Sequence, residues 1–164
     1  MASTTALSQE HISEILDVIG PQIQPVTALS DANDDYCLIK ANIPAGAVVP
    51  LHSHADRETF FILTGELQAL RNDHWITLVS GDVLDVPGGL RHAWRNRSSA
   101  PVALLIVTNM RLGRFLREIG RPAATVAQGP PTAADFSRLM ETAQAYGYWV
   151  GTAAENAKVG ISLG

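Results

Sequence analysis

The chain has 164 residues, of which 46% are hydrophobic and 17% charged, and its net charge at pH 7 is −4. These values are typical of one globular domain with its own core, and they exclude a general attraction to nucleic acid or acidic membranes. A single cysteine, Cys37, excludes an internal disulfide framework. We expect a cytoplasmic protein, because no apolar stretch approaches the roughly 20 residues that span a bilayer and the first residues do not resemble a secretory signal.

The first predicted element is a helix near the N-terminus. Ser8 can cap it, and Gly20-Pro21 would end it. Its apolar positions follow helical spacing: Ile12, Ile15, Leu16 and Ile19. Residues 1–34 are therefore predicted to form an N-terminal helical extension. This segment is short and not basic, which argues against a DNA-binding regulator.

Short β-prone runs dominate the middle of the chain, residues 35–110. The runs are YCLIKA, ETFFIL, ELQAL, HWITLV, DVLDV, RHAWR and VALLIVTN, and turn residues separate most of them. Many short strands at this spacing indicate an antiparallel sandwich or barrel, so the core is predicted to be all-β. Cys37, inside the first run, is expected to be a buried, inert thiol. The basic run RHAWRNR (91–97) is expected to be a strand with solvated arginines rather than a nucleic-acid patch.

The last part, residues 111–164, is predicted to be a helical extension. One helix carries apolar residues at helical spacing: Leu112, Phe115, Leu116 and Ile119. Another begins at Thr132, where TAAD resembles a capping arrangement, with this predicted apolar face: Phe136, Leu139, Met140 and Ala143. Three amphipathic helices offer more apolar surface than one small barrel can cover, so we expect a homodimer.

Two clusters in the β region carry candidate metal ligands. In PLHSHADRETF (50–60), His52, His54 and Glu58 share the parity that places side chains on one face of a strand. In GDVLDVPGGLRHAWRN (81–96), His92 follows a Pro-Gly-Gly turn and enters the next strand. Three imidazoles and one carboxylate suit a divalent Fe, Mn, Ni, Cu or Zn ion and leave coordination positions open for a substrate. The alternative is a set of satisfied polar groups in a barrel without a metal.

These two clusters resemble the two motifs of the cupin superfamily. The pattern Gly-x5-His-x-His-x3-Glu-x6-Gly is met by residues 46–65, and Gly-x5-Pro-x-Gly-x2-His-x3-Asn by residues 81–96. The resemblance covers residues 35–110 and implies a double-stranded β-helix, the cupin or jelly-roll barrel, with one metal ion near its open end. It also implies that the ligands are His52, His54, Glu58 and His92. Asn96 is then expected to tie strand ends together.

The stretch ADRETFFILTGELQAL is similar to quercetinase-type and polyketide-modifying cupins. That similarity implies dioxygenase-like chemistry on a small apolar or aromatic molecule. Glu58 is also a candidate catalytic base, because burial in an apolar barrel raises the pKa of a carboxyl group. The alternatives are a non-oxidative isomerase, cyclase or lyase that uses the metal as a Lewis acid, and a non-catalytic small-molecule-binding protein.

Other polar and aromatic residues are open to structural interpretations. Solvent exposure is expected for Asp56 and Arg57, and His11 and His74 are expected on the surface. Trp94 can line a pocket or pack in the core. The aromatic cluster at residues 146–149 is expected to make core or subunit contacts. Periodicity does not choose the inward face of the outer strands, so the candidate pocket residues there are left open: Tyr36, Leu38 and Ile106.

Overall fold

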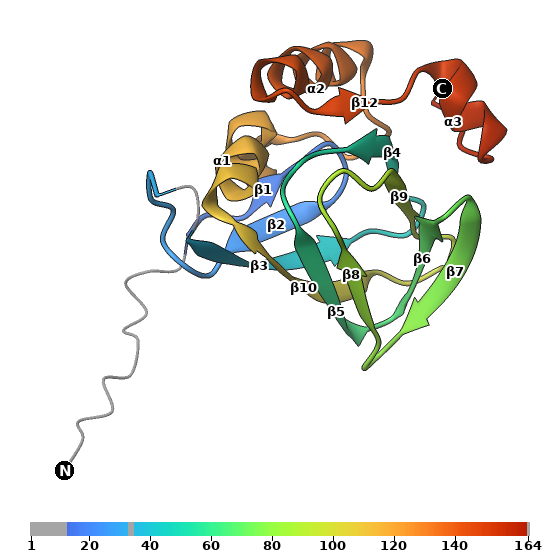
Figure 1. The fold of residues 1–164 in the computed structure, drawn as a ribbon, viewed down its shortest axis with the longest axis horizontal. Coiled ribbons are helices and arrows are strands. Elements are labelled where there is room, and N and C mark those ends of the chain that lie inside the picture. The colour runs from blue at the N-terminus through green and yellow to red at the C-terminus, as the bar shows by residue number, and fades with distance from the viewer. Residues whose placement is uncertain (1–12, 33–34, 164) are drawn as a thin grey trace.

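The computed structural model of the chain describes residues 13–32 and 35–163 (Figure 1). Its strands are β1 (Leu16–Asp17), β2 (Gln22–Pro25), β3 (Tyr36–Ile43), β4 (Val48–Ser53), β5 (Glu58–Thr64), β6 (Glu66–Arg71), β7 (His74–Val79), β8 (Val83–Val86), β9 (His92–Arg95), β10 (Val102–Asn109), β11 (Arg121–Pro122) and β12 (Trp149–Val150). Its helices are α1 (Met110–Ile119), a 3-10 turn (Ala123–Thr125), α2 (Ala133–Tyr146) and α3 (Ala153–Lys158). None of the helices in the described part is long and apolar enough to cross a membrane.

The strands form two antiparallel sheets that enclose one apolar core. The larger sheet has the order β11-β1-β2-β3-β10-β5-β8, and the smaller has the order β12-β4-β9-β6-β7. Their inward side chains, among them Ile39, Ile62 and Leu104, are almost fully buried. Figure 1 shows the helices gathered on one side of this β core. The all-β prediction is therefore confirmed, and the arrangement is a double-stranded β-helix with flanking helices.

The predicted N-terminal helix is wrong for the residues that the structure describes; Ser8 and Ile12 lie outside them. Leu16 and Ile23 pair across the β1–β2 hairpin and are buried. Ile19 and Gly20 have φ angles of 64° and 115°, which a right-handed helix does not allow. The Asp17 carboxylate accepts hydrogen bonds from both of their N–H groups. Turn formation and strand burial thus override a spacing that matched a helix by coincidence.

Both predicted C-terminal helices are confirmed. Asn109, the last residue of β10, caps α1 by accepting from the Leu112 N–H. Thr132 caps α2 in a reciprocal capping box with Asp135, and the helix ends at Gly147 with φ 70°. The two helices share a second core made by Leu112, Phe115, Ile119, Ala143 and Tyr148. Met140 was predicted on the buried face of α2 but is 47% exposed; the buried residues of this helix are Asp135 and Ala143.

The inward face of β3 is the odd-numbered one. Cys37, Ile39 and Ala41 are buried, whereas Tyr36 is 67% exposed. Tyr36 therefore does not line the interior, and Leu38 shares its outward parity. The Cys37 thiol is buried as predicted, and burial raises its pKa.

Candidate metal centre

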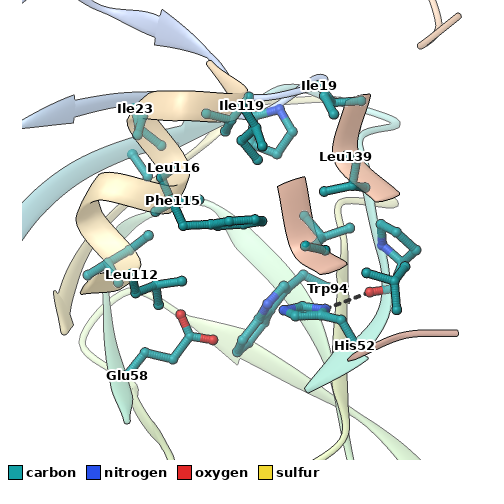
Figure 2. Close-up of a pocket in the computed structure, with 18 of the residues that line it drawn as sticks. Ile19, Ile23, His52, Glu58, Trp94, Leu112, Phe115, Leu116, Ile119 and Leu139 are labelled. Carbon is teal, nitrogen blue, oxygen red and sulfur yellow. Dashed lines mark hydrogen bonds between the residues drawn. The ribbon is translucent and has the colours of Figure 1, made fainter. Parts of the chain in front are cut away.

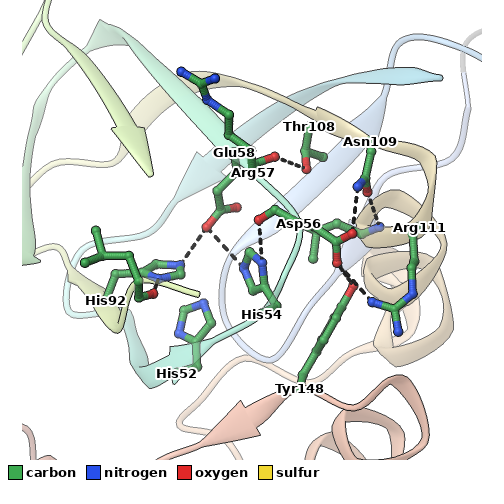
Figure 3. Close-up of polar contacts among 12 residues, drawn as sticks. His52, His54, Asp56, Arg57, Glu58, His92, Thr108, Asn109, Arg111 and Tyr148 are labelled. Carbon is green, nitrogen blue, oxygen red and sulfur yellow. Dashed lines mark hydrogen bonds and ion pairs between the residues drawn. The ribbon is translucent and has the colours of Figure 1, made fainter. Parts of the chain in front are cut away.

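The three histidines and the glutamate converge at one end of the β core. His52 lies on β4, His54 just after it, Glu58 opens β5 and His92 opens β9 (Figure 3). Strands β4 and β9 are paired so that His52 lies opposite His92. One ligand atom from each of the four residues lies within 4.8 Å of the others. Strand pairing thus brings His92 next to three residues that lie 34 or more positions before it in the chain.

The turn between β8 and β9 holds the two clusters against each other. The Gly89 N–H donates to the His54 carbonyl oxygen at 2.7 Å, with Gly89 at φ 82°. A Cβ atom on Gly88 would lie 2.1 Å from the Ala55 carbonyl oxygen. Glycine is therefore required there, since any side chain would push the two segments apart.

Each histidine ring is oriented by a backbone carbonyl. The Nδ1 atoms of His52, His54 and His92 lie 2.7, 2.8 and 2.8 Å from the carbonyl oxygens of Pro50, Asp56 and Leu90, respectively. In a neutral imidazole whose Nδ1–H donates to a carbonyl, the lone pair is on Nε2 and can bind a metal, which is how proteins orient imidazole ligands. Three nitrogen donors and one carboxylate oxygen that all lie within 4.8 Å of one another fit a divalent transition metal ion.

Glu58 is ionised in this cluster. Its Oε1 atom lies 2.7 Å from His92 Nε2 and 3.5 Å from His54 Nε2. Burial raises the pKa of Glu58, but the hydrogen bonds and charges of these two histidines outweigh burial and lower the pKa to about 2. The predicted rise in the pKa of Glu58 is therefore wrong, because the neighbouring imidazoles compensate for the loss of water.

The pKa values of the two histidines of the first cluster are shifted in opposite directions. Burial lowers the pKa of His52 to about 3, which keeps its imidazole neutral. Burial also lowers the pKa of His54, but its hydrogen bond and charge interaction with Glu58 outweigh that effect and raise it. A metal ion at this point would therefore compete with a proton on His54.

Asp56 was predicted to be exposed, and the structure contradicts this. The residue is 5% exposed, and its carboxylate accepts hydrogen bonds from Asn109 Nδ2 at 2.6 Å, Arg111 Nη1 at 3.2 Å and the Tyr148 hydroxyl (Figure 3). Its backbone carbonyl meanwhile accepts from His54 Nδ1. Asp56 shares the even-numbered parity of His52, His54 and Glu58, and this is the one feature of the sequence that indicates that Asp56 is buried.

Other predictions near the site have mixed outcomes. Arg57 is exposed as expected and pairs with Asp85 at 2.7 Å. The Asn96 side chain donates to the Ile43 and Ala100 carbonyl oxygens, so it ties strand ends together. His74 is exposed as predicted, and His11 lies outside the described residues.

A cavity of about 150 Å³ opens from the cluster toward the helices (Figure 2). His52, His54 and Glu58 line one part of it, and Trp94, Ile106 and Tyr148 are also in its wall. Trp94 is therefore both a core residue and a pocket residue. Tyr148 packs in the second core as expected, with its ring centroid 5.2 Å from that of His54.

Comparison with known proteins agrees with this fold. The profile of the Cupin domain family matches residues 40–108. An RmlC-like cupin from Shewanella frigidimarina is 18% identical, with a TM-score of 0.53, over 66% of this chain and 91% of that one. The polyketide cyclase RemF from Streptomyces resistomycificus is 14% identical, with a TM-score of 0.51, over 61% and 70% of the two chains.

A sugar phosphate isomerase from a cupin superfamily, from Silicibacter pomeroyi, is 22% identical, with a TM-score of 0.51, over 63% of this chain and 74% of that one. A search of the curated proteins found no match. At these identities the likeness shows the fold, and the chemistry of this chain has to be argued from its own residues.

Proposed function

We propose that residues 40–108, which match the Cupin domain profile, bind one divalent metal ion through the four-residue cluster, and that the protein is an enzyme for small apolar or aromatic molecules. The observation that carries this proposal is the continuity between the cluster and an apolar cavity. His52, His54 and Glu58 are part of the cavity wall, so a molecule in the cavity reaches the proposed metal position. A closed structural metal site would have no such opening.

The four residues would hold the ion as three neutral imidazoles and one carboxylate. Iron, manganese, nickel, copper and zinc all accept this donor set. A bound ion would supply a Lewis acid and, if it is redox-active, a binding position for dioxygen. The residues of this chain orient the donors, exclude bulk water and keep Glu58 ionised.

We propose dioxygenase-like chemistry first, on the strength of the sequence similarity around residues 55–70. A non-oxidative isomerase, cyclase or lyase is the second candidate, and a non-catalytic binding protein the third. Elemental analysis of the purified protein, followed by oxygen-electrode measurements with aromatic enols, separates them. Oxygen uptake supports the first candidate, and conversion without uptake supports the second. A loaded protein that converts nothing across a broad panel supports the third, and a protein without bound metal would contradict the proposal.

The proposed base role of Glu58 is weakened by its lowered pKa. A carboxylate with a pKa of about 2 is a poor proton acceptor, so we expect it to act mainly as a ligand. Replacing Glu58 with glutamine should therefore weaken metal binding about 10- to 100-fold. Activity lost in proportion to metal, and restored by excess metal, would support the ligand role. A fully loaded Glu58→Gln protein without turnover would instead support the base role.

The homodimer remains a proposal, and the outer face of the larger sheet offers a surface for it. Phe61, Val83 and Val107 project from β5, β8 and β10 and are each at least 40% exposed. Phe61 and Val83 are register partners, so this outer sheet face is continuous. Multi-angle light scattering at micromolar concentration should give a mass about twice 17.6 kDa. Phe61→Lys should shift the mass toward one chain, and a monomeric unaltered protein would contradict the proposal.

A further inference from the structure

We propose that the ligand of this site is an amphiphile, with one oxygen-donor head group at the metal position and an uncharged apolar body. The body would lie in an apolar lobe of the cavity, defined by Ile19, Leu116, Ile119, Phe136 and Leu139. The inference about the head group depends on the proposed metal site, whereas the inference about the body depends only on the cavity.

The cavity is polar at one end and apolar at the other. In Figure 2, His52 and Glu58 lie at one end of the drawn residues, and Ile19, Ile119 and Leu139 lie at the other. The apolar end is built by segments far apart in the chain, namely the β1–β2 turn, α1 and α2. A molecule that enters it exchanges water for aliphatic and aromatic side chains, which favours an apolar body.

The charges of the cavity wall admit one negative group. Among the described residues, no lysine, arginine or aspartate lines the cavity, and Glu58 is its only carboxylate. A divalent ion held by neutral imidazoles and Glu58 has a net charge of +1, which favours one anionic or strongly polarised oxygen. A second charge in the lobe would be buried without a partner, so phosphorylated sugars and dicarboxylates fit poorly.

Trp94 adds one directional contact. The residue is 5% exposed, lines the cavity and packs against Phe60 and His92, with ring centroids at 4.1 and 5.6 Å. In the described part of the chain its indole N–H has no acceptor, although no fully enclosed side-chain nitrogen or oxygen lacks a partner. The indole nitrogen is therefore not fully enclosed, and because Trp94 lines the cavity, a carbonyl or hydroxyl oxygen of the head group would supply the missing acceptor.

The segment that covers the lobe is tied to the metal centre itself. Strand β12 pairs with β4, with Val150 opposite His52. The buried Asn156 side chain accepts from the Leu51 N–H at 2.8 Å and donates to the Gly151 carbonyl oxygen at 2.9 Å. The C-terminal segment that includes α2 and β12 is therefore held against the β core, so its side chains limit which molecules fit in the lobe.

Calorimetric titration of the zinc-loaded protein with n-alkanoates from butanoate to decanoate tests the proposal. Affinity should rise about fourfold for each added methylene until the lobe is full. Glucose 6-phosphate should bind more weakly than octanoate. Equal affinity along the series, no alkanoate binding, or tighter binding of glucose 6-phosphate would overturn the inference.

Two variants of α2 locate the apolar body. Leu139→Arg places a charge in the lobe and should abolish the gain per methylene, whereas Met140→Arg, at the neighbouring exposed position, should leave it unchanged. Leu139→Trp keeps the lobe apolar but fills part of it, so the gain should stop at a shorter chain. Thermal unfolding of each variant identifies any that fail to fold, and an unchanged series in a folded Leu139→Arg protein would overturn the placement.

The same titration of metal-depleted protein separates this inference from the proposed metal site. If the cluster binds no metal, zinc will change nothing, and the dependence on chain length will remain. If the lobe does not hold the body, zinc will bind and raise the affinity for alkanoates, but that affinity will be the same for every chain length.

Discussion

Replacing His92 with alanine is expected to lower the affinity of the protein for a divalent metal ion by more than about 100-fold. His92 is 2% exposed, its Nδ1 atom is oriented by the Leu90 carbonyl oxygen, and its Nε2 atom lies 2.7 Å from Glu58 Oε1. Alanine removes one of three nitrogen donors and leaves a hole beside Glu58 that water can fill only in part. His92 also joins the second cluster to the first, so its loss breaks the convergence on which the proposed chemistry depends.

Competition with a chromophoric chelator measures this change for zinc and nickel. His74→Ala is the matched control, because His74 is an exposed imidazole on β7 away from the cluster and should bind no metal of its own. The unaltered protein and the control should retain one ion per chain after dialysis, and His92→Ala should retain almost none. Equal retention by all three proteins would place the metal elsewhere or exclude it.

Replacing Asp56 with alanine is expected to destabilise the metal-free protein by about 3 kcal/mol. The change leaves Arg111 without its ion-pair partner, and it removes the acceptor of the buried Tyr148 hydroxyl and of the half-buried Asn109 amide. Both Asn109, which caps α1, and Tyr148, which precedes β12, depend on this carboxylate. The free energy of unfolding, measured with urea, should fall accordingly.

Asp85→Ala is the control for Asp56. Asp85 also pairs with an arginine, Arg57, but both side chains are exposed, so its loss should cost less than about 1 kcal/mol. Metal affinity provides a second measurement. Because Asp56 holds the turn whose carbonyl orients His54, Asp56→Ala should weaken metal binding about 10-fold, whereas Asp85→Ala should not change it. An Asp56→Ala protein as stable as Asp85→Ala would contradict the network.

Asp56 connects the C-terminal segment to the proposed metal site. Its carboxylate binds Arg111 of α1 and Tyr148 at the end of the α2 connection, while its backbone binds His54. Burial raises the pKa of the Tyr148 hydroxyl and the hydrogen bond to Asp56 raises it further, so the phenol stays a donor at physiological pH. The helices therefore close the cavity and also help to orient one proposed ligand.

Prediction from the sequence succeeded where a residue type has a local requirement. The caps of α1 and α2 depend on neighbours three residues away, and the turn glycines depend on their own φ angles. It failed at β1, where Leu16 and Ile19 have helical spacing but Leu16 pairs with Ile23 and Ile19 occupies a turn. Short apolar periods do not distinguish these outcomes, because the burial that decides between them comes from other strands.

The sequence by itself determined the β core and the two C-terminal helices, because those features follow from spacing and turn chemistry within short segments. The four residues that converge at the mouth of the core were expected from the resemblance of two separate motifs to those of the cupins, and strand pairing brings them together. Only the tertiary structure decided that Asp56 is buried, that Tyr148 joins it from 92 residues away and that α1 and α2 close an apolar lobe. It also decided the state of Glu58, since its pKa depends on imidazoles that strand pairing places beside it. Contacts between distant segments leave no period in the sequence, so these features became visible only when the chain was folded.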